Sequence, residues 1–389
     1  MKKTKIIRTA TIPFSLNLLL KGQLSFLNQH VDITAVSGAG KDLDEVARRE
    51  GVKTYPIEMQ RQISLLKDLK SLWKLYRYFK KERPQIVHSI TPKAGLLSML
   101  AAKMAGVPVR IHTFTGLLFP YRTGLLQKIL ITTDKILCWA ATSIFPEGKG
   151  VMHDLQKFGI TQKPLKIIAN GNVNGIDLHF FSPEQVTAEE KAKLKFTWDI
   201  GAEDFVFVFV GRLVKDKGIN ELVSAFSALN TQPQYQHIKL LLVGNTEPAL
   251  DPLEPGTIAK IEHNSNIIAV GFQPDVRSFL AISTALVFPS YREGFPNVVL
   301  QAGAMGLPMI VTDISGCNEI VIPNENGIII EPRSEVALRE AMKTLLENSQ
   351  LRIKLQESSR SFITSRYNQD IVWNSLLEEY RLLLSKHQN

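Results

Sequence analysis

Residues 291–308 read YREGFPNVVLQAGAMGLP and lie between two apolar runs, 285–290 and 309–312. The apolar runs are typical of strands buried on both faces of a parallel sheet, and the residues between them predict a turn followed by a helix. Glu293 therefore follows the carboxyl end of a strand and precedes a helix N-terminus. In an open α/β sheet ligands bind at this position, beside the unpaired N–H groups of the helix.

The same alternation of strands and helices extends along the chain in both directions. In the second half, apolar runs predict strands at 205–210, 239–243, 267–270, 285–288, 309–312 and 327–330. In the first half, strands are predicted at 5–12, 32–37, 85–89, 110–114 and 166–169, with helices at 17–29, 42–50, 64–83, 94–105 and 125–140. This pattern predicts an α/β fold with two doubly wound, Rossmann-like parallel sheets, each in its own domain.

The turn-forming stretch 171–175, GNVNG, is the natural boundary between these domains. We expect an N-terminal domain over 1–172 and a C-terminal domain over 173–365. A helical segment over 366–389 is expected to pack back on the N-terminal domain. Two such domains are expected to face each other across a cleft, where a ligand can bind.

The charge of the chain is distributed unevenly. The net charge is +9, but residues 1–180 carry 27 Lys and Arg against 12 Asp and Glu, whereas the remainder carries 19 against 25. The basic first half suggests an anionic partner, which could be a membrane surface, a nucleic acid or a phosphorylated substrate. The sequence contains no stacking platform or groove motif typical of nucleic-acid binding, so we expect no nucleic-acid partner.

Helix 64–83 allows two interpretations. The apolar side chains on one face are Leu65, Leu69, Leu72, Tyr76 and Phe79, and the basic side chains on the other are Lys67, Lys70, Lys74, Arg77 and Lys81. In one interpretation the apolar face packs on the first sheet and the basic face is merely solvated. In the other, the basic face contacts anionic lipid headgroups. The two interpretations are compatible.

The sequence also indicates a compartment. No apolar run is typical of a transmembrane helix, and the N-terminus lacks a signal-peptide cleavage pattern. The two cysteines, Cys138 and Cys317, lie in apolar contexts and form neither a metal pattern nor a disulfide framework. These features predict a cytoplasmic protein without a structural metal.

Residues 211–218, GRLVKDKG, follow the predicted strand 205–210 directly. Gly211 lets the backbone approach a ligand, and Arg212 and Lys217 offer the fork and the mobile point charge that match a diphosphate. The alternative interpretation is an ordinary turn with solvated lysines.

Strand ends in the first half offer weaker candidates. His112, in the run RIHTFTG at 110–116, could donate a hydrogen bond to a substrate oxygen or transfer a proton. It could equally be a strand-end histidine with a backbone partner. Lys93 lies at a predicted helix start and could contact a phosphate.

Taken together, the motifs resemble those of family 4 glycosyltransferases, which are retaining enzymes of the GT-B fold. The resemblance rests on 211–218, on Gly271 and Phe272, on EGFP at 293–296 with the following helix, and on GCNE at 316–319. The stretches 12–17, IPFSLN, and 88–95, HSITPKAG, are similar to the subgroup that builds surface polysaccharides on polyprenyl-diphosphate carriers.

The resemblance implies a nucleotide-sugar donor, most simply a UDP-sugar, on the second domain and a polyprenyl-diphosphate-linked sugar acceptor at the inner face of the plasma membrane. It implies no metal and no cofactor, because cations and a helix N-terminus stabilise the leaving diphosphate. The implied catalytic residues are Glu293, Arg212, Lys217 and His112. The implied donor-binding residues are Gly211, Phe272, Gly294, Phe295, Pro296, Asn297 and Gln301, and the implied acceptor-binding residues are Ser15, Lys93 and Thr115. In this resemblance Arg212 and Lys217 would neutralise the diphosphate and Glu293 would contact the hydroxyls of the donor sugar. The backbone near Phe272 would hold the base, and Gln301 the ribose.

Two features depart from the family pattern. The second glutamate of its Glu-x7-Glu motif is replaced by Gln301, which keeps the length and an acceptor oxygen but loses the charge. The paired glycines of its first βα loop are absent from 15–17 and 21–23. Two alternatives to a transferase are a GT-B nucleotide-sugar epimerase and a non-catalytic, membrane-associated nucleotide-sugar-binding protein.

Overall fold

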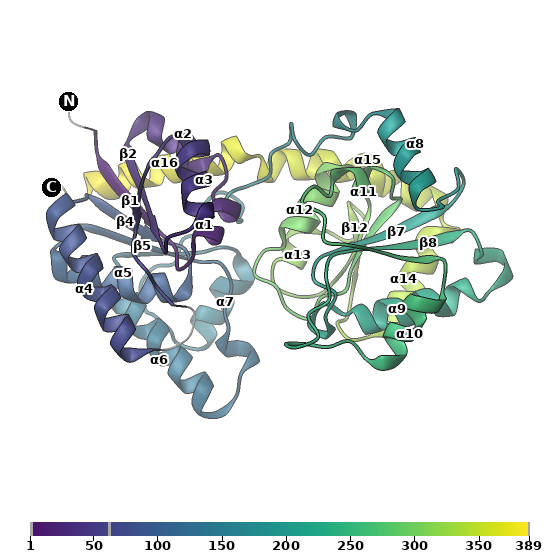
Figure 1. The fold of residues 1–389 in the computed structure, drawn as a ribbon, viewed down its shortest axis with the longest axis horizontal. Helices are drawn as coiled ribbons and strands as arrows, with labels where there is room; N and C mark the ends of the chain where they lie inside the picture. Colours follow the sequence, from purple (N-terminus) through teal and green to yellow (C-terminus); the bar gives the residue numbers. More distant parts are fainter. Residues whose placement is uncertain (1–2, 61–63, 388–389) are drawn as a thin grey trace. The chain divides into compact units, whose positions relative to one another are not determined.

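The computed structural model describes residues 3–60 and 64–387 (Figure 1). The chain forms two compact units. Unit 1 contains Met1–Gly175 and Gln369–Asn389, and unit 2 contains Ile176–Asn368. The chain therefore leaves unit 1 once and returns to it with the last helix, α16 (Gln369–Ser385).

Each unit contains a six-stranded sheet in which every described strand pair is parallel. The unit 1 order is β3-β2-β1-β4-β5-β6, and the unit 2 order, β12-β11-β10-β7-β8-β9, is the same topology. Both are the doubly wound order of Rossmann folds, in which the strand order reverses at one switch point. The α/β class and the two Rossmann-like parallel sheets are confirmed.

The strands of unit 1 are β1 (Lys5–Thr9), β2 (Asp32–Ser37), β3 (Lys53–Pro56), β4 (Ile86–Ser89), β5 (Val109–Phe114) and β6 (Ser143–Pro146). Its helices before α16 are α1 (Pro13–Leu19), α2 (Gln23–His30), α3 (Lys41–Glu50), α4 (Leu65–Glu82), α5 (Pro92–Ala105), α6 (Gly124–Ala140) and α7 (Lys149–Lys157). Figure 1 shows α4, α5 and α6 on one face of the sheet and α1, α2, α3 and α16 on the other. Each face has its own apolar core.

The strands of unit 2 are β7 (Phe205–Val210), β8 (Ile238–Val243), β9 (Ile267–Gly271), β10 (Ala285–Phe288), β11 (Met309–Thr312) and β12 (Gly327–Ile330). Its helices are α8 (Ala188–Thr197), α9 (Ile219–Asn230), α10 (Pro255–His263), α11 (Arg277–Ala281), α12 (Asn297–Ala304), α13 (Cys317–Ile320), α14 (Glu335–Glu347) and α15 (Ser349–Tyr367). The six strands predicted for this half are confirmed, because each carries a nearly continuous run of apolar residues, and in β10 and β11 every residue is buried.

The first half of the chain differs from the predicted elements at several positions. Strands β3 and β6 were not predicted, because neither carries a continuous apolar run: β3 reads KTYP and is largely exposed, and β6 reads SIFP. The strand predicted at 166–169 is wrong: the chain there forms only an isolated bridge between Ile144 and Leu165. The helix predicted at 17–29 is also wrong. It is two helices, α1 and α2, separated at Gly22, whose φ of +81° a helix cannot contain.

Helix α4 does not bury the whole apolar face that was expected to pack on the sheet. Its buried residues are Ser71, Leu75 and Phe79, which recur every four positions. Leu65 and Leu69 were expected to pack on the sheet, but their side chains are 76% and 61% exposed. The first two turns of α4 therefore present leucines to the outside rather than to the core.

Candidate active site

The switch point of unit 2 brings the two main motifs together. Strands β7 and β10 are neighbours in the sheet, and the loops 211–218 and 289–297 follow them. The backbone N–H of Tyr291 donates to the carbonyl of Asp216 at 2.9 Å, and Nε of Arg292 donates to Oδ2 of Asp216 at 2.7 Å. The two loops thus form one structure at the carboxyl edge of the sheet, where open α/β sheets bind ligands.

Two glycines are required by the close approach to the 289–297 loop, Gly218 in the loop after β7 and Gly316 in the loop after β11. Gly218 has φ of +71°, and a Cβ placed on it would lie 2.2 Å from the carbonyl oxygen of Pro289. Gly316 has φ of +78°, and its Cβ would lie 2.3 Å from the carbonyl oxygen of Gly294. Both positions combine a left-handed backbone with contacts that leave no room for a side chain.

Lys217 and Glu293 form an ion pair through Nζ and Oε1, and each side chain is only 16% exposed. Two residues from separate motifs, one expected at the phosphate and one at the sugar, are therefore in direct contact. Burial and the charge of Glu293 raise the pKa of the neighbouring Cys317 thiol, so this cysteine stays protonated and unreactive. A diphosphate bound by Lys217 would have to compete with Glu293 for its ammonium group.

Arg212 extends from the same loop and is exposed. Its NH1 donates to Oε2 of Glu247 at 2.5 Å, a carboxylate that the sequence analysis did not single out. Glu247 lies four residues beyond β8, just after the Gly244–Asn245 turn. Its position after a third strand of the same sheet was the signal that could have identified it.

The structure places Phe272 at the end of β9 with its ring exposed. Its backbone N–H already donates to Oδ1 of Asn245 at 2.9 Å, so the backbone that was predicted to hold the base is held by a neighbouring turn. The exposed ring offers a stacking surface for a base.

The other predicted donor residues lie at the start of α12. Pro296 is its N-cap residue, and Asn297 and Gln301 are one turn apart and half-buried, so they share a helix face. Phe295 is buried, with its ring packed on Tyr367 at 5.6 Å between centroids. The ring of Phe295 is therefore not available to a ligand.

In unit 1, His112 is fully buried in β5. Its Nδ1 shares a hydrogen bond with Oγ of Ser89 at 2.8 Å, and its ring lies against Gly95 of α5. Burial lowers the pKa of His112 to about 3, so the ring is neutral at physiological pH. This environment favours the structural interpretation over a proton-transfer role, although its partner is a side chain and not the expected backbone group.

The three predicted acceptor residues follow three different strands at the carboxyl edge of unit 1. Ser15 is half-buried in α1, and Oγ1 of Thr115 donates to the carbonyl of Ile90 at 3.2 Å. Lys93, in the first turn of α5, pairs with Asp68 of α4 at 2.8 Å. A phosphate at Lys93 would therefore have to share the lysine with this carboxylate.

Sequence reasoning missed a buried polar cluster at the same edge. Arg8 of β1 is fully buried; its NH1 donates to Oε1 of Gln23 at 2.9 Å and to the hydroxyl of Tyr380 in α16 at 3.0 Å. His88 bonds to that hydroxyl through Nδ1 at 2.6 Å and to Oγ1 of Thr113 through Nε2 at 2.7 Å. Burial and then the charge of Arg8 hold the pKa of His88 well below its usual value.

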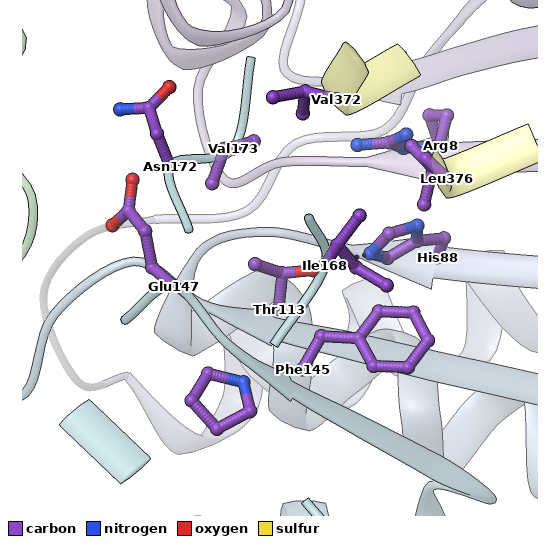
Figure 2. Close-up of a pocket in the computed structure, with 11 residues that line it drawn as sticks. Arg8, His88, Thr113, Phe145, Glu147, Ile168, Asn172, Val173, Val372 and Leu376 are labelled. Carbon is purple, nitrogen blue, oxygen red and sulfur yellow. Dashed lines mark hydrogen bonds between the residues drawn. The ribbon is translucent and has the colours of Figure 1, made fainter. Parts of the chain in front are cut away.

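Figure 2 shows the pocket beside this cluster, with Arg8 and His88 on one side, Glu147 and Asn172 on the other, and Thr113 between them. Among the described residues, Nε and NH2 of Arg8 have no hydrogen-bond partner. An arginine directly after the apolar pair Ile6–Ile7 of a predicted strand was the signal in the sequence.

Within residues 3–60 and 64–387, no group of three or more His, Cys, Asp or Glu side chains is arranged to hold a metal ion. In the same residues, no helix has both the length and the hydropathy needed to cross a bilayer.

Comparisons with known proteins cover the whole chain. Residues 26–171 match the family model described as "Glycosyl transferase 4-like domain", and residues 190–362 match "Glycosyl transferases group 1". The capsular polysaccharide biosynthesis glycosyltransferase CapM of Staphylococcus aureus is 31% identical over 100% of both chains. An Escherichia coli enzyme named as a UDP-Gal:alpha-D-GlcNAc-diphosphoundecaprenol alpha-1,3-galactosyltransferase is 28% identical, over 88% of this chain and 86% of its own.

Solved structures show the same fold. A glycosyltransferase from Rickettsia africae superposes with a TM-score of 0.81 at 19% identity, covering 99% of each chain. The Anabaena protein HepE, solved in complex with UDP, gives a TM-score of 0.79 at 17% identity over 98% of this chain and 100% of its own. With two parallel six-stranded sheets, matches to both domain models and end-to-end similarity to a capsular glycosyltransferase, the chain belongs to the family 4 glycosyltransferases of the GT-B fold.

Proposed function

We propose that this glycosyltransferase moves a hexose or an N-acetylhexosamine from a UDP-sugar to a saccharide linked to a polyprenyl diphosphate, with retention of the anomeric configuration. The product would be an intermediate of a surface polysaccharide. In this reaction the acceptor hydroxyl attacks the anomeric carbon on the face from which UDP departs, the bond between that carbon and the diphosphate oxygen breaks, and the hydroxyl proton passes to the departing diphosphate.

The observation that carries the proposal is the meeting of the 211–218 and 289–297 loops, which places Lys217 on Glu293 at the switch point. Similarity to CapM supports a role in surface polysaccharide synthesis. The acceptor class is supported by the E. coli galactosyltransferase and by a Campylobacter jejuni N-acetylgalactosaminyltransferase named for a diphospho-undecaprenol substrate, 24% identical over 80% of this chain. The donor nucleotide is taken from the name of the E. coli relative.

Each residue of the site then has a distinct task. Arg212 and Lys217 stabilise the negative charge that builds up on the departing diphosphate, which is the main electrostatic requirement of the reaction. Glu293 accepts hydrogen bonds from the hydroxyls of the donor sugar once Lys217 engages the phosphate. Gln301 bonds the ribose hydroxyls through its amide, and unit 1 holds the acceptor at the cytoplasmic face of an anionic membrane.

The test is a transfer assay with the purified chain, a panel of UDP-hexoses and UDP-N-acetylhexosamines, and short-chain polyprenyl-diphosphate sugars. We expect one donor to give a glycosylated acceptor, identified by mass spectrometry, whose new linkage has the anomeric configuration of the donor by NMR. Donor turnover that needs no acceptor and yields an epimer would replace the proposal by an epimerase. Binding of UDP-sugars without turnover on any acceptor would replace it by a non-catalytic role.

A further inference from the structure

Exposed apolar side chains gather along one edge of unit 1. Leu65, Leu66, Leu69 and Trp73 of α4, with Leu125 and Ile129 of α6, are each at least 40% exposed. These six residues are called the apolar rim below. Single exposed leucines are ordinary on a protein surface, but a group on two helices of one layer marks an interaction surface.

Helix geometry explains why the rim points outward. In α4, Ser71, Leu75 and Phe79 face the sheet, so Leu66, Leu69 and Trp73 lie on the opposite side of the helix. In α6, Leu137, Cys138 and Ala140 are buried, which leaves the first two turns of its outer face to Leu125 and Ile129.

The rim residues of the two helices belong to the same edge of the unit. Asp68 in the first turn of α4 pairs with Lys93 in the first turn of α5, and α5 in turn packs on α6. Figure 1 shows the three helices side by side on one face of the sheet. Because each crossover helix starts where a strand ends, their first turns lie at the carboxyl edge, where Thr115 and Lys93 also lie.

Basic side chains flank the rim. Lys67, Lys70, Lys74 and Arg77 are exposed on α4, and Lys128 is exposed on α6. The one carboxylate in the first four turns of α4, that of Asp68, is engaged by Lys93. The surface is therefore apolar at its centre and positively charged at its margin.

The apolar centre and basic margin of this surface distinguish between two partners, a second copy of the protein and a lipid bilayer. Interfaces between protein copies are depleted in lysine, whereas a helix with Leu and Trp on its outer face and lysines beside them is suited to the boundary between lipid headgroups and acyl chains. We propose that the apolar rim inserts into an anionic bilayer, with the flanking cations on its headgroups, and so holds the carboxyl edge of unit 1 against the lipid that carries the acceptor. This deepens the proposed function, on which its link to catalysis rests, by naming the surface that meets the membrane.

The binding test is co-sedimentation of the full chain with vesicles of phosphatidylcholine and phosphatidylglycerol at 3:1, and with phosphatidylcholine alone. We expect the Leu66→Ser/Leu69→Ser variant to bind the anionic vesicles about tenfold more weakly than the wild type. We expect Lys70→Glu/Lys74→Glu to lose at least as much on anionic vesicles, and to lose nothing on neutral ones. All of these side chains are exposed, so circular dichroism and melting temperature should match the wild type.

Matched controls come from unit 2. Phe196→Ser removes an exposed phenylalanine of α8, and Lys193→Glu/Lys354→Glu reverses two exposed lysines of α8 and α15. Both should bind vesicles like the wild type. Wild-type binding by the rim variants, or equal losses in the controls, would overturn the proposal. So would a dimer in analytical ultracentrifugation that the rim variant splits while vesicle binding is unchanged.

Transfer assays with two kinds of acceptor separate membrane docking from sugar transfer. With a short-chain, water-soluble acceptor, the rim variants should turn over like the wild type; with a long-chain acceptor in vesicles, they should slow by about the factor lost in binding. If the wild type transfers sugar to no acceptor but the rim still governs vesicle binding, the proposed function fails and the docking surface stands.

Discussion

At the scale of single residues, the Lys217–Glu293 pair is the most informative contact, because it joins the proposed phosphate and sugar contacts. Lys217→Ala should lower kcat/KM about a hundredfold or more with every nucleotide sugar, since a charge-assisted bond to the leaving group is lost. Glu293→Gln should lower kcat while UDP affinity, measured by calorimetry, stays within a few fold of the wild type. Equal losses of UDP affinity and of turnover in Glu293→Gln would contradict a sugar contact.

Gly218 allows a sharper test of the loop geometry. Gly218→Ala adds a methyl group 2.2 Å from the carbonyl oxygen of Pro289, whereas Gly306→Ala, at a similar φ of +79°, meets nothing within 4 Å. The Gly306 variant should lose about 1 kcal/mol in free energy of unfolding from the left-handed backbone alone. The Gly218 variant should lose more than about 3 kcal/mol, because the loop must also move. Urea denaturation compares the two, and equal losses would mean that the loops do not meet as described.

At the scale of elements, α16 belongs to unit 1 although 193 residues of unit 2 precede it in the chain. Its Tyr380 hydroxyl bonds to both Arg8 and His88, and Glu379 pairs with Lys166. Tyr380→Phe leaves a buried cation and a buried imidazole each short of a partner. We expect a loss of about 1–3 kcal/mol in free energy of unfolding.

The control for α16 is Tyr76→Phe, which removes the hydroxyl of a half-buried tyrosine in α4, outside this cluster. It should change the stability by less than about 0.5 kcal/mol. Equal effects of the two substitutions in chemical denaturation would show that the Arg8–His88–Tyr380 cluster contributes nothing particular to docking α16.

At the scale of the whole molecule, the two units should respond differently to acid. Unit 1 holds His88 and His112, both buried with lowered pKa values, whereas the histidines of unit 2 are exposed. Histidine has a pKa of about 6.5 in an unfolded chain. Below this pH the unfolded state binds protons that the folded imidazoles do not bind, so the free energy of unfolding decreases as the pH falls. Asp134 works in the opposite direction, because burial raises its pKa to about 7.

The proton bound by folded Asp134 offsets one of the two protons that His88 and His112 bind in the unfolded chain. The free energy of unfolding of unit 1 should therefore fall by about 1 kcal/mol for each unit of decreasing pH between pH 6.5 and 4.5. Asp134→Asn should double this slope, and His112→Gln should nearly abolish it. The buried thiols report each unit separately, Cys138 in unit 1 and Cys317 in unit 2. On acidification, dithiodipyridine should label Cys138 before Cys317. Simultaneous labelling of both thiols, with the same pH dependence of stability in the variants as in the wild type, would contradict this assignment of the titrating groups.

By itself the sequence determined the fold class, the six strands of the second half and the motifs that identify the family. These follow from local signals, because a doubly buried strand must be continuously apolar and a loop that approaches phosphate needs glycine and cations in fixed order. The sequence also placed Lys217 and Glu293 in one site, through their positions at strand ends.

Only the tertiary structure decided which groups meet. The contact of Lys217 with Glu293, the burial of His112 against Gly95 and the clustering of Arg8 with Tyr380 all join residues far apart in the chain. The outward face of α4 was also decided at this level, because Ser71 takes the buried position opposite Leu66, where a hydrophobicity pattern favours leucine. Side-chain pairing depends on how strands and helices are packed, and local sequence carries no record of that packing.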